Sequence, residues 1–312
     1  MVGCNEHPDP RWARPARNKV VESEVDEWAT ADGQRVAVFS QEPDGAGEKP
    51  VVVLCHGLGG SHRGYAGLGH HLASYGYAVL HPQFRDAFEL AGPELGLSGV
   101  DERTWAADPV ARQRMHALLF DPEHWLSRVD RVHAVLNALP AKWNLKPDHV
   151  LLAGHSFGAY TAQLLLGTRL SGYGTFTHPA VAGGILLSPQ GSGDRGLTPN
   201  SWREVELPLL VVTGTRDVGA RGEGVEWRRE PYDRARSRFK HLAVVHDGDH
   251  QLGAIPGHDT ENSPTAAAIS AVATAFVKRV HGDRAAGEWL ASAPFPAIFD
   301  HTHQEEAACP TS

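Results

Sequence analysis

The sequence predicts an α/β fold in which a mostly parallel, doubly wound sheet is covered by helices on both faces. Short, continuous apolar runs recur along the chain and end in glycine or polar residues, as is typical of buried parallel strands. Segments with the apolar spacing of amphipathic helices separate these runs. The alternation continues from about residue 50 to residue 281 without an internal repeat, which indicates a single domain.

Each element of this alternation has its own signal in the sequence. The predicted strands are the apolar runs at residues 50–57, 77–82, 149–155, 181–189, 207–215 and 241–248. The predicted helices have the apolar spacing of a helix face and cover residues 64–76, 124–139, 159–170 and 263–282. Ser263 directly precedes the run of the last helix, so we expect it to cap that helix.

The two ends of the chain fall outside the alternation. Residues 1–20 are polar and rich in Pro and Arg, which predicts an extended lead-in. Residues 24–41 alternate between apolar and polar around a Gly turn, which is typical of an antiparallel hairpin. We therefore expect one domain over residues 21–292, followed by a loose, polar C-terminal tail over residues 293–312.

One connection within the domain is unusually long. Residues 85–125 separate the second predicted parallel strand from the next helix, and long insertions in compact domains commonly serve function. The segment lies at one end of the predicted sheet, so we expect a cap-like insertion over a pocket. Four tryptophans in or beside predicted loops are candidates for an apolar acyl pocket, with core packing as the default: Trp105, Trp125, Trp202 and Trp227.

Composition limits the classes of function and partner. The 312 residues carry a net charge of −8 without a basic cluster, which argues against nucleic acid or an anionic membrane as the main partner. No apolar run approaches the roughly 18 residues of a membrane span. The N-terminus lacks the apolar core of a signal peptide, so a cytoplasmic location is the default expectation. A secreted or lipoprotein origin is expected only if the N-terminus was trimmed, and the sequence does not reveal the oligomeric state.

Chemistry-bearing residues follow four of the predicted parallel strands. Ligands of open α/β sheets bind beyond the carboxyl ends of the strands, so side chains at these ends converge. The glycine-rich turn at residues 56–60 follows the first strand, and Ser156 follows the strand at residues 149–155. Asp217 and His250 follow two later strands. A serine, a carboxylate, an imidazole and a glycine-rich turn are therefore expected at one edge of the sheet.

Ser156 is the predicted nucleophile. It stands between Gly154 and Gly158 at a strand-to-helix junction, where a sharp turn would expose its hydroxyl and leave no room for flanking side chains. A serine hydroxyl needs a neighbouring base, and His250 can take its proton and later return it to the leaving group. Asp217 would fix the imidazole tautomer and stabilise the imidazolium.

The negative oxygen of a tetrahedral intermediate needs hydrogen-bond donors that are already in place. The amide of Phe157, directly after the predicted nucleophile, is one candidate, and the amide of Leu58 in the glycine-rich turn is the second. Glycines at positions 57, 59 and 60 are expected to let this backbone approach the substrate without a side chain in the way.

The motifs HGLGG, GHSFGA, TGTRD and GDH, in this order, resemble the α/β-hydrolase superfamily, whose triads follow the chain order Ser, Asp, His. Residues 56–86 together with GHSFGA resemble most the serine esterases of the platelet-activating-factor acetylhydrolase and dienelactone-hydrolase-like branch. The resemblance covers roughly residues 48–281 and implies the roles assigned above, with no cofactor. One departure is that true dienelactone hydrolases use a cysteine nucleophile, whereas this chain has a serine.

Alternatives remain at the two supporting positions. His246, four residues before His250, is the competing base, although its place at the end of an apolar run suits a structural histidine better. Three other carboxylates compete with Asp217 for the role of acid: Asp194, Asp247 and Asp249. His56 is expected to be structural, and Arg85 and Asp86 are expected to form a salt link.

The predicted activity is cleavage of a small-molecule carboxylic ester through an acyl-enzyme, with the acyl length limited by the insertion. The 19 histidines invite a metal site, but no pair has the spacing of a zinc motif, and no glycine pattern fits nucleotide binding. We therefore predict neither a metal nor a cofactor. Two other classes stay open: amidase, thioesterase or acyltransferase chemistry with the same triad, and a non-hydrolytic ligand-binding protein of the same fold.

Overall fold

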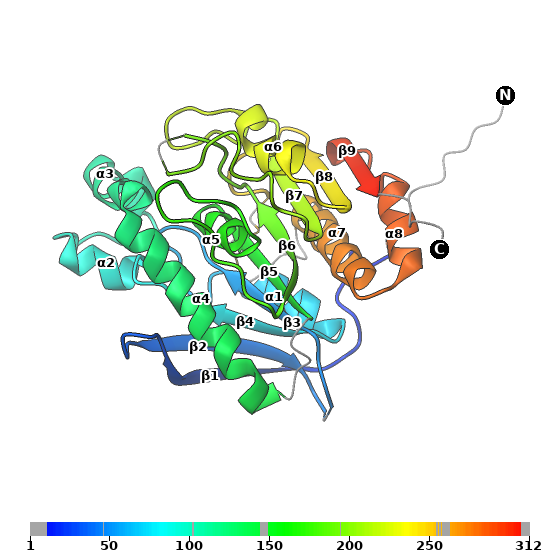
Figure 1. The fold of residues 1–312 in the computed structure, drawn as a ribbon, viewed down its shortest axis with the longest axis horizontal. Coiled ribbons are helices and arrows are strands. Elements are labelled where there is room, and N and C mark those ends of the chain that lie inside the picture. Colours follow the sequence, from blue (N-terminus) through cyan, green and yellow to red (C-terminus); the bar gives the residue numbers. More distant parts are fainter. Residues whose placement is uncertain are drawn as a thin grey trace.

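A single mixed sheet organises the molecule. The computed structural model describes residues 11–45, 47–101, 103–143, 149–193, 195–253, 255, 257 and 263–306. Nine strands lie in the order β1-β2-β4-β3-β5-β6-β7-β8-β9 (Figure 1). Their bounds are β1 Val20–Ala29, β2 Arg35–Pro43, β3 Val51–Cys55, β4 Ala78–Pro82, β5 Val150–His155, β6 Val181–Leu187, β7 Leu209–Gly214, β8 Phe239–Val245 and β9 Phe299–Glu306.

The centre of the sheet is parallel and its edges are antiparallel. Strands β3 to β8 pair in parallel with their neighbours in this order. The hairpin of β1 and β2 joins antiparallel to β4, and β9 joins antiparallel to β8. The predicted fold class, a mostly parallel doubly wound sheet with an N-terminal antiparallel hairpin, is confirmed.

Helices cover both faces of the sheet. On one face lie α4 Pro122–Trp143, α5 Phe157–Leu165 and α6 Val225–Arg234, and on the other lie α1 Ala66–Ser74, α7 Pro264–Val280 and α8 Arg284–Ala291. Successive residues of β3 point to opposite faces, so Val53 packs in the first core and Val52 in the second. The Ser263 hydroxyl accepts a hydrogen bond from the Ala266 amide and caps α7, as predicted.

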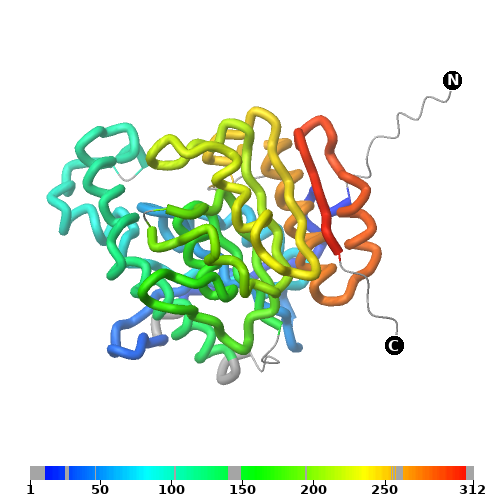
Figure 2. Tube along the Cα trace, turned by 45° about the horizontal axis from the view of Figure 1, so that its top comes forward, coloured from blue at the N-terminus to red at the C-terminus, as the bar shows by residue number. Residues whose placement is uncertain are grey.

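The insertion at residues 85–125 forms a small layer of its own at one side of the molecule (Figure 2). It contains α2 Phe88–Glu94, α3 Pro109–Ala117, the beginning of α4, and two 3-10 turns, η1 Trp105–Ala107 and η2 Leu118–Phe120. Six buried residues give this layer a separate apolar core: Phe88, Ala91, Leu97, Ala111, Met115 and Leu118. A packed layer beside the sheet edge is the arrangement expected of a cap-like insertion.

The expectation of a loose C-terminal tail over residues 293–312 is wrong for its central part. Phe299–Glu306 forms strand β9, which continues the sheet by pairing with β8. Figure 2 shows this strand running beside β8. Polar side chains suit an edge strand because one face of the strand is exposed to water. Its backbone hydrogen bonds to the neighbouring strand do not depend on the side chains. Residues 307–312 lie outside the described part of the chain.

The N-terminal lead-in packs against the domain from residue 11 onward. The Ala16 amide donates to the Ser74 hydroxyl over 2.8 Å, and the Asn18 side chain donates to the Ser74 carbonyl over 2.7 Å. Trp12 meets the ring of Trp289 edge to face, with centroids 5.0 Å apart. These contacts fix the segment to α1 and α8, while residues 1–10 lie outside the described part.

None of the helices in the described part of the chain combines the length and the apolar character that a membrane crossing needs.

Five histidines are almost wholly buried, and this predicts that the fold is sensitive to acid. Burial lowers the pKa of each to about 3 or 4, well below the value of 6.5 in an unfolded chain: His56, His71, His81, His155 and His241. At a pH between the folded and the unfolded pKa, these histidines bind more protons in the unfolded chain than in the folded chain. Stability is therefore lost as the pH falls below about 6.5.

Each such histidine costs about 1.4 kcal/mol for every pH unit below 6.5, so five together cost about 10 kcal/mol at pH 5. This is comparable to the whole stability of a typical domain, about 5–15 kcal/mol. Urea unfolding between pH 7.5 and pH 5 is expected to show a steep fall in the free energy of unfolding. An unfolding free energy that stays constant over this range would contradict the burial of these imidazoles.

Candidate active site

Ser156 occupies a strained turn between β5 and α5. Its backbone has φ 53° and ψ −119°, a conformation that costs energy for a residue with a side chain. A Cβ at Gly154 would lie 2.2 Å from the backbone carbonyl of Gly158, as the expected crowding requires. A Cβ at Gly158 would lie 2.0 Å from the carbonyl oxygen of Cys55, so this glycine is needed for close packing against β3.

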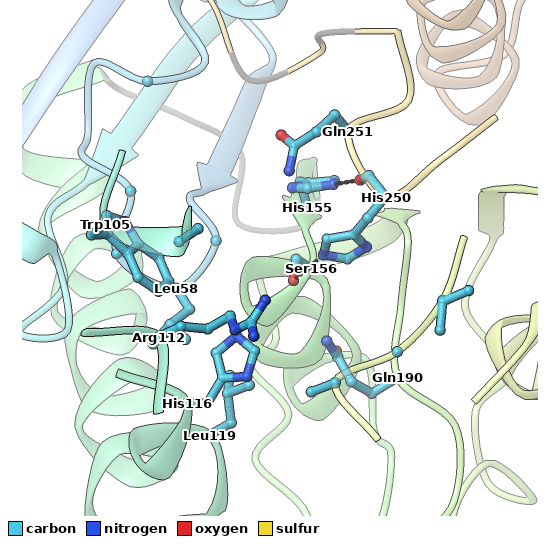
Figure 3. A pocket seen from close by; sticks show the side chains of 18 of the residues that line it. Leu58, Trp105, Arg112, His116, Leu119, His155, Ser156, Gln190, His250 and Gln251 are labelled. Carbon is cyan, nitrogen blue, oxygen red and sulfur yellow. Dashed lines mark hydrogen bonds between the residues drawn. The ribbon is translucent and has the colours of Figure 1, made fainter. Parts of the chain in front are cut away.

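The structure brings the three predicted side chains together. The Ser156 hydroxyl lies 2.9 Å from Nε2 of His250 (Figure 3). Nδ1 of His250 lies 2.8 Å from Oδ1 of Asp217. The second carboxylate oxygen of Asp217 accepts a hydrogen bond from the Thr213 hydroxyl over 2.9 Å. In this geometry Nδ1–H donates to the carboxylate and Nε2 is free to accept the serine proton.

The environment of Asp217 keeps it ionised. Burial raises the pKa of this carboxyl, but the hydrogen bond from His250 and the charge of Arg228 outweigh burial, and the pKa falls to about 2. Its side chain is fully buried, whereas 33% of the His250 side chain is exposed. The pair therefore combines a fixed negative charge with an imidazole that water and substrate can reach.

The competing residues lie elsewhere or serve other contacts. His246 is 62% exposed and points to Asp300, 3.5 Å away, so it does not replace His250 at the serine. Asp247 pairs with Arg216 at the surface. Asp249 accepts a hydrogen bond from the amide of Gln251. The remaining candidate acid, Asp194, lies outside the described residues.

The two predicted oxyanion donors border the serine. Phe157 is the first residue of α5, and Leu58 lies in the turn after β3 and lines the same cavity as Ser156. Within the described residues, neither backbone amide has a hydrogen-bond acceptor in the protein. Both amides are therefore available to an oxygen of a bound molecule, and the positive end of the α5 dipole adds to the Phe157 side.

Arg128, on α4, holds the turn that contains Leu58. Its guanidinium forms a fully buried ion pair with Asp86 at 2.6 Å and donates to the carbonyls of His56 and Gly57 over 2.8 and 3.4 Å. In a trans peptide the carbonyl and the following N–H point in opposite directions, so fixing the Gly57 carbonyl also aims the Leu58 amide. Asp86 thus forms the expected salt link, but with Arg128 and not with Arg85.

A cavity of about 840 Å³ opens beside Ser156. The insertion contributes one wall through Trp105, Arg112 and His116, and Trp227 from α6 lies on another. Figure 3 shows the side chains of Arg112 and His116 reaching from α3 into this space. Of the four tryptophans considered from the sequence, these two line the cavity, whereas Trp125 and Trp202 are buried in the core.

The comparisons with known proteins agree with this fold. The model of the alpha/beta hydrolase family matches residues 52–306 of the chain. The chain belongs to the alpha/beta hydrolase family. The structure also resembles that of a putative dienelactone hydrolase from Klebsiella pneumoniae subsp. pneumoniae MGH 78578, with a TM-score of 0.56 and 14% sequence identity. The similarity covers 78% of this chain and 94% of that one. No curated protein sequence matches the chain.

In this α/β hydrolase the residue in the strained turn between β5 and α5 is a serine and not a cysteine, as the sequence shows. The thiol of Cys55 is fully buried in β3, and burial raises its pKa to about 12. The residue is therefore a core hydrophobe and not a reactive thiol. Within the described residues, no three His, Cys, Asp or Glu side chains gather closely enough to hold a metal ion.

Arg228 of the hydrolase was not recognised from the sequence. Its side chain is 2% exposed, with Nε 3.1 Å from Oδ1 of Asp217 and Nη2 3.2 Å from Nδ1 of His250. Nη1 donates to the carbonyls of Ser188 and Pro189 over 3.0 and 2.9 Å. The guanidinium thus holds the Asp217 carboxylate in place beside His250. No helix was predicted over residues 225–234, so nothing in the sequence placed this arginine beside Asp217.

Two further side chains fix the loop that carries His250. The Tyr65 hydroxyl donates to Nδ1 of His155 over 2.8 Å, and Nε2–H of His155 donates to the backbone carbonyl of His250 over 2.7 Å (Figure 3). Burial lowers the pKa of His155 to about 3, so its ring stays neutral and retains this donor and acceptor pattern. His155 therefore positions the His250 backbone, a role that its sequence neighbourhood did not indicate.

Gly59 joins the glycine-rich turn to the insertion, and this predicts a mutational effect. The residue has φ 68°, and a Cβ would lie 2.6 Å from the ring of Trp105. Gly59→Ala is expected to push Trp105 and the turn apart, lower kcat/KM for hydrolysis at least ~10-fold, and cost about 1–2 kcal/mol of stability. Steady-state kinetics and urea unfolding measure the two effects.

Gly99→Ala is the matched control for this substitution. Gly99 lies in the same insertion, and a Cβ there would meet no heavy atom within 4 Å. Equal effects of the two substitutions would contradict the close approach of Trp105 to the turn. Gly59 was expected to make room for substrate, but the structure assigns its space to a side chain of the insertion.

Proposed function

We propose that this α/β hydrolase cleaves carboxylic esters of small molecules through an acyl-enzyme, without a cofactor. One observation carries the proposal: contacts of 2.9 and 2.8 Å run without interruption from Ser156 through His250 to Asp217. Family membership supports hydrolase activity in general. The cavity beside the serine, of about 840 Å³, suits a small or medium-sized molecule.

In the first half-reaction, Oγ of Ser156 attacks the ester carbonyl carbon and its proton passes to Nε2 of His250. The carbonyl oxygen becomes negative and accepts hydrogen bonds from the amides of Leu58 and Phe157. The carbon–oxygen bond to the alcohol then breaks, and the departing alkoxide takes the proton from His250. The acyl group remains on Ser156.

In the second half-reaction, water attacks the acyl carbon while His250 takes its proton. The new tetrahedral intermediate collapses, Ser156 regains a hydrogen from His250, and the carboxylic acid leaves. Asp217 stays ionised throughout and stabilises the imidazolium in both halves, because its pKa lies far below neutral pH. The partial exposure of His250 leaves a path by which water can reach the acyl-enzyme.

Three related reactions would use the same groups: hydrolysis of amides, hydrolysis of thioesters, and acyl transfer to another alcohol. We favour esters over amides because an alkoxide leaves more easily than an amine anion and depends less on the timing of proton delivery. The other alternative, a protein of this fold that only binds its ligand, has no need of a serine in a strained turn next to a histidine.

The test is turnover of matched p-nitrophenyl esters and p-nitroanilides, with acyl chains from acetyl to palmitoyl and with Ser156→Ala as the blank. We expect turnover of the esters, with short or medium chains favoured because the insertion bounds the cavity. Faster turnover of the anilides would replace the esterase assignment by an amidase. Absence of turnover in both series would favour the ligand-binding alternative.

A further inference from the structure

The charge of the cavity carries information about the substrate beyond the reaction type. Among the described residues that line it, the cationic side chains are numerous and no Asp or Glu is present. The arginines are Arg103, Arg112, Arg195 and Arg228. Arg228 is neutralised by Asp217, and Arg103 lies 3.8 Å from Asp101. Arg112 and Arg195 have no ion-pair partner in the described part of the chain.

Arg195 is the most unusual of these groups. It is only 4% exposed, and its guanidinium lies over the rings of Phe120 and Trp227, 4.8 and 5.4 Å from their centroids. Its Nε is buried without a hydrogen-bond partner. Of the other buried arginines in the described chain, Arg128 and Arg228 each contact a carboxylate. Arg131 instead donates to two backbone carbonyls and to the side chain of Gln34. Burial lowers the pKa of Arg195, and the charge of Glu223 offsets this effect only in part. A buried cation without a carboxylate in contact is costly, so a site that keeps one on its wall is suited to an anion from solution.

Arg112 and His116 face the same space from α3, one helical turn apart (Figure 3). The charges of Arg112, Arg195 and His250 all contribute to lowering the pKa of His116, after the larger effect of its burial. Their fields therefore overlap at one place in the cavity. An anion bound there would lie in the same cavity as Ser156 and would offset the positive charges of Arg112 and Arg195.

We propose that the substrate is an ester that carries a carboxylate, and that Arg195 and Arg112 bind this carboxylate beside the reacting carbonyl. A guanidinium offers paired N–H donors that match the two oxygens of a carboxylate. The rings of Phe120 and Trp227 hold the Arg195 guanidinium in place. The partial burial of the site excludes water that would otherwise weaken the attraction between this guanidinium and a carboxylate. This inference rests on the proposed ester hydrolysis.

Two pairs of esters test the charge preference, one for each side of the ester bond. For the alcohol side, 4-acetoxybenzoate is compared with methyl 4-acetoxybenzoate. For the acyl side, the mono-p-nitrophenyl ester of adipic acid is compared with p-nitrophenyl hexanoate. In at least one pair we expect kcat/KM of the anionic ester to exceed that of the neutral ester at least ~10-fold, after correction for uncatalysed hydrolysis.

Variants assign this preference to the arginines. Arg195→Gln and Arg112→Gln are each expected to lower the ratio of anionic to neutral kcat/KM about 10-fold, and Arg195→Lys to restore part of it. Arg112 is exposed, so its variant remains informative if the buried Arg195 site does not tolerate glutamine. The matched control is Arg169→Gln, which removes a surface arginine paired with Glu204 outside the cavity and should leave the ratio unchanged.

The outcomes separate the two proposals. Turnover of the neutral esters without any preference for the anionic ones overturns the carboxylate site and leaves the esterase assignment standing. The carboxylate site is also overturned if the ratio of anionic to neutral kcat/KM is unchanged in both glutamine variants, or if it falls equally in Arg169→Gln. Absence of turnover with every ester overturns the proposed function itself.

Discussion

Replacing Ser156 with alanine is expected to lower kcat/KM for ester hydrolysis by roughly 10⁵- to 10⁶-fold, because no acyl-enzyme can then form. The fold should be unaffected, since the Ser156 hydroxyl contacts only His250 among the described side chains. A small residual rate above that of free ester in water is expected, because the backbone amides of Leu58 and Phe157 remain in place. The purified variant should also lose the initial burst of p-nitrophenol that an accumulating acyl-enzyme produces.

Ser171→Ala is the control for this substitution. Ser171 is exposed on a loop away from the cavity, so its replacement should leave kcat/KM within about 2-fold of the parent value. Retention of more than a few per cent of the activity in Ser156→Ala would mean that another nucleophile, or directly activated water, carries the reaction.

Asp217→Asn is expected to lower kcat by roughly 10⁴-fold. The amide nitrogen of asparagine would donate to Nδ1 of His250, which would place the ring hydrogen on Nε2. In that tautomer His250 cannot accept the Ser156 proton. The substitution also leaves the buried Arg228 guanidinium without its carboxylate, 3.1 Å away in the parent protein. Steady-state kinetics across pH 6.5–9 measure the effect.

The matched control is Asp249→Asn, because Asp249 lies one residue from His250, and among the described residues its carboxylate accepts a hydrogen bond only from the amide of Gln251. A loss of less than 10-fold in that variant, against the large loss in Asp217→Asn, supports the assignment of the acid. Comparable losses of kcat in the two variants would contradict the assignment, because the carboxylate of Asp249 would then matter as much as that of Asp217.

The elements that fix the site were largely predictable from the sequence. Buried parallel strands are apolar throughout, so their carboxyl ends could be located, and parallel pairing then placed Ser156, Asp217 and His250 at one edge. Strand β9 was missed because an edge strand needs no apolar face and its backbone pairing leaves little trace in the residue types. Its sequence is polar in the same way as a loop.

The supporting arginines could not be predicted, for a different physical reason. Arg128 lies on a predicted amphipathic helix, and Arg228 lies in a charged segment for which no helix was predicted. Neither position signals burial, yet each side chain is at most 2% exposed. Their partners are 42 and 11 residues away in the chain, at Asp86 and Asp217, and only the folded sheet brings these groups together. Long-range pairing of this kind has no local signal.

The most direct measurement of the central claim is covalent labelling of the folded protein with a fluorophosphonate, followed by peptide mass spectrometry. The account predicts one adduct per chain, located on Ser156, formed in the native protein and abolished by heat denaturation. His250→Ala should slow its formation by orders of magnitude, because the hydroxyl would then lack its base. A native protein that stays unlabelled, or an adduct that persists on another residue in Ser156→Ala, would contradict the claim that Ser156 is the activated nucleophile.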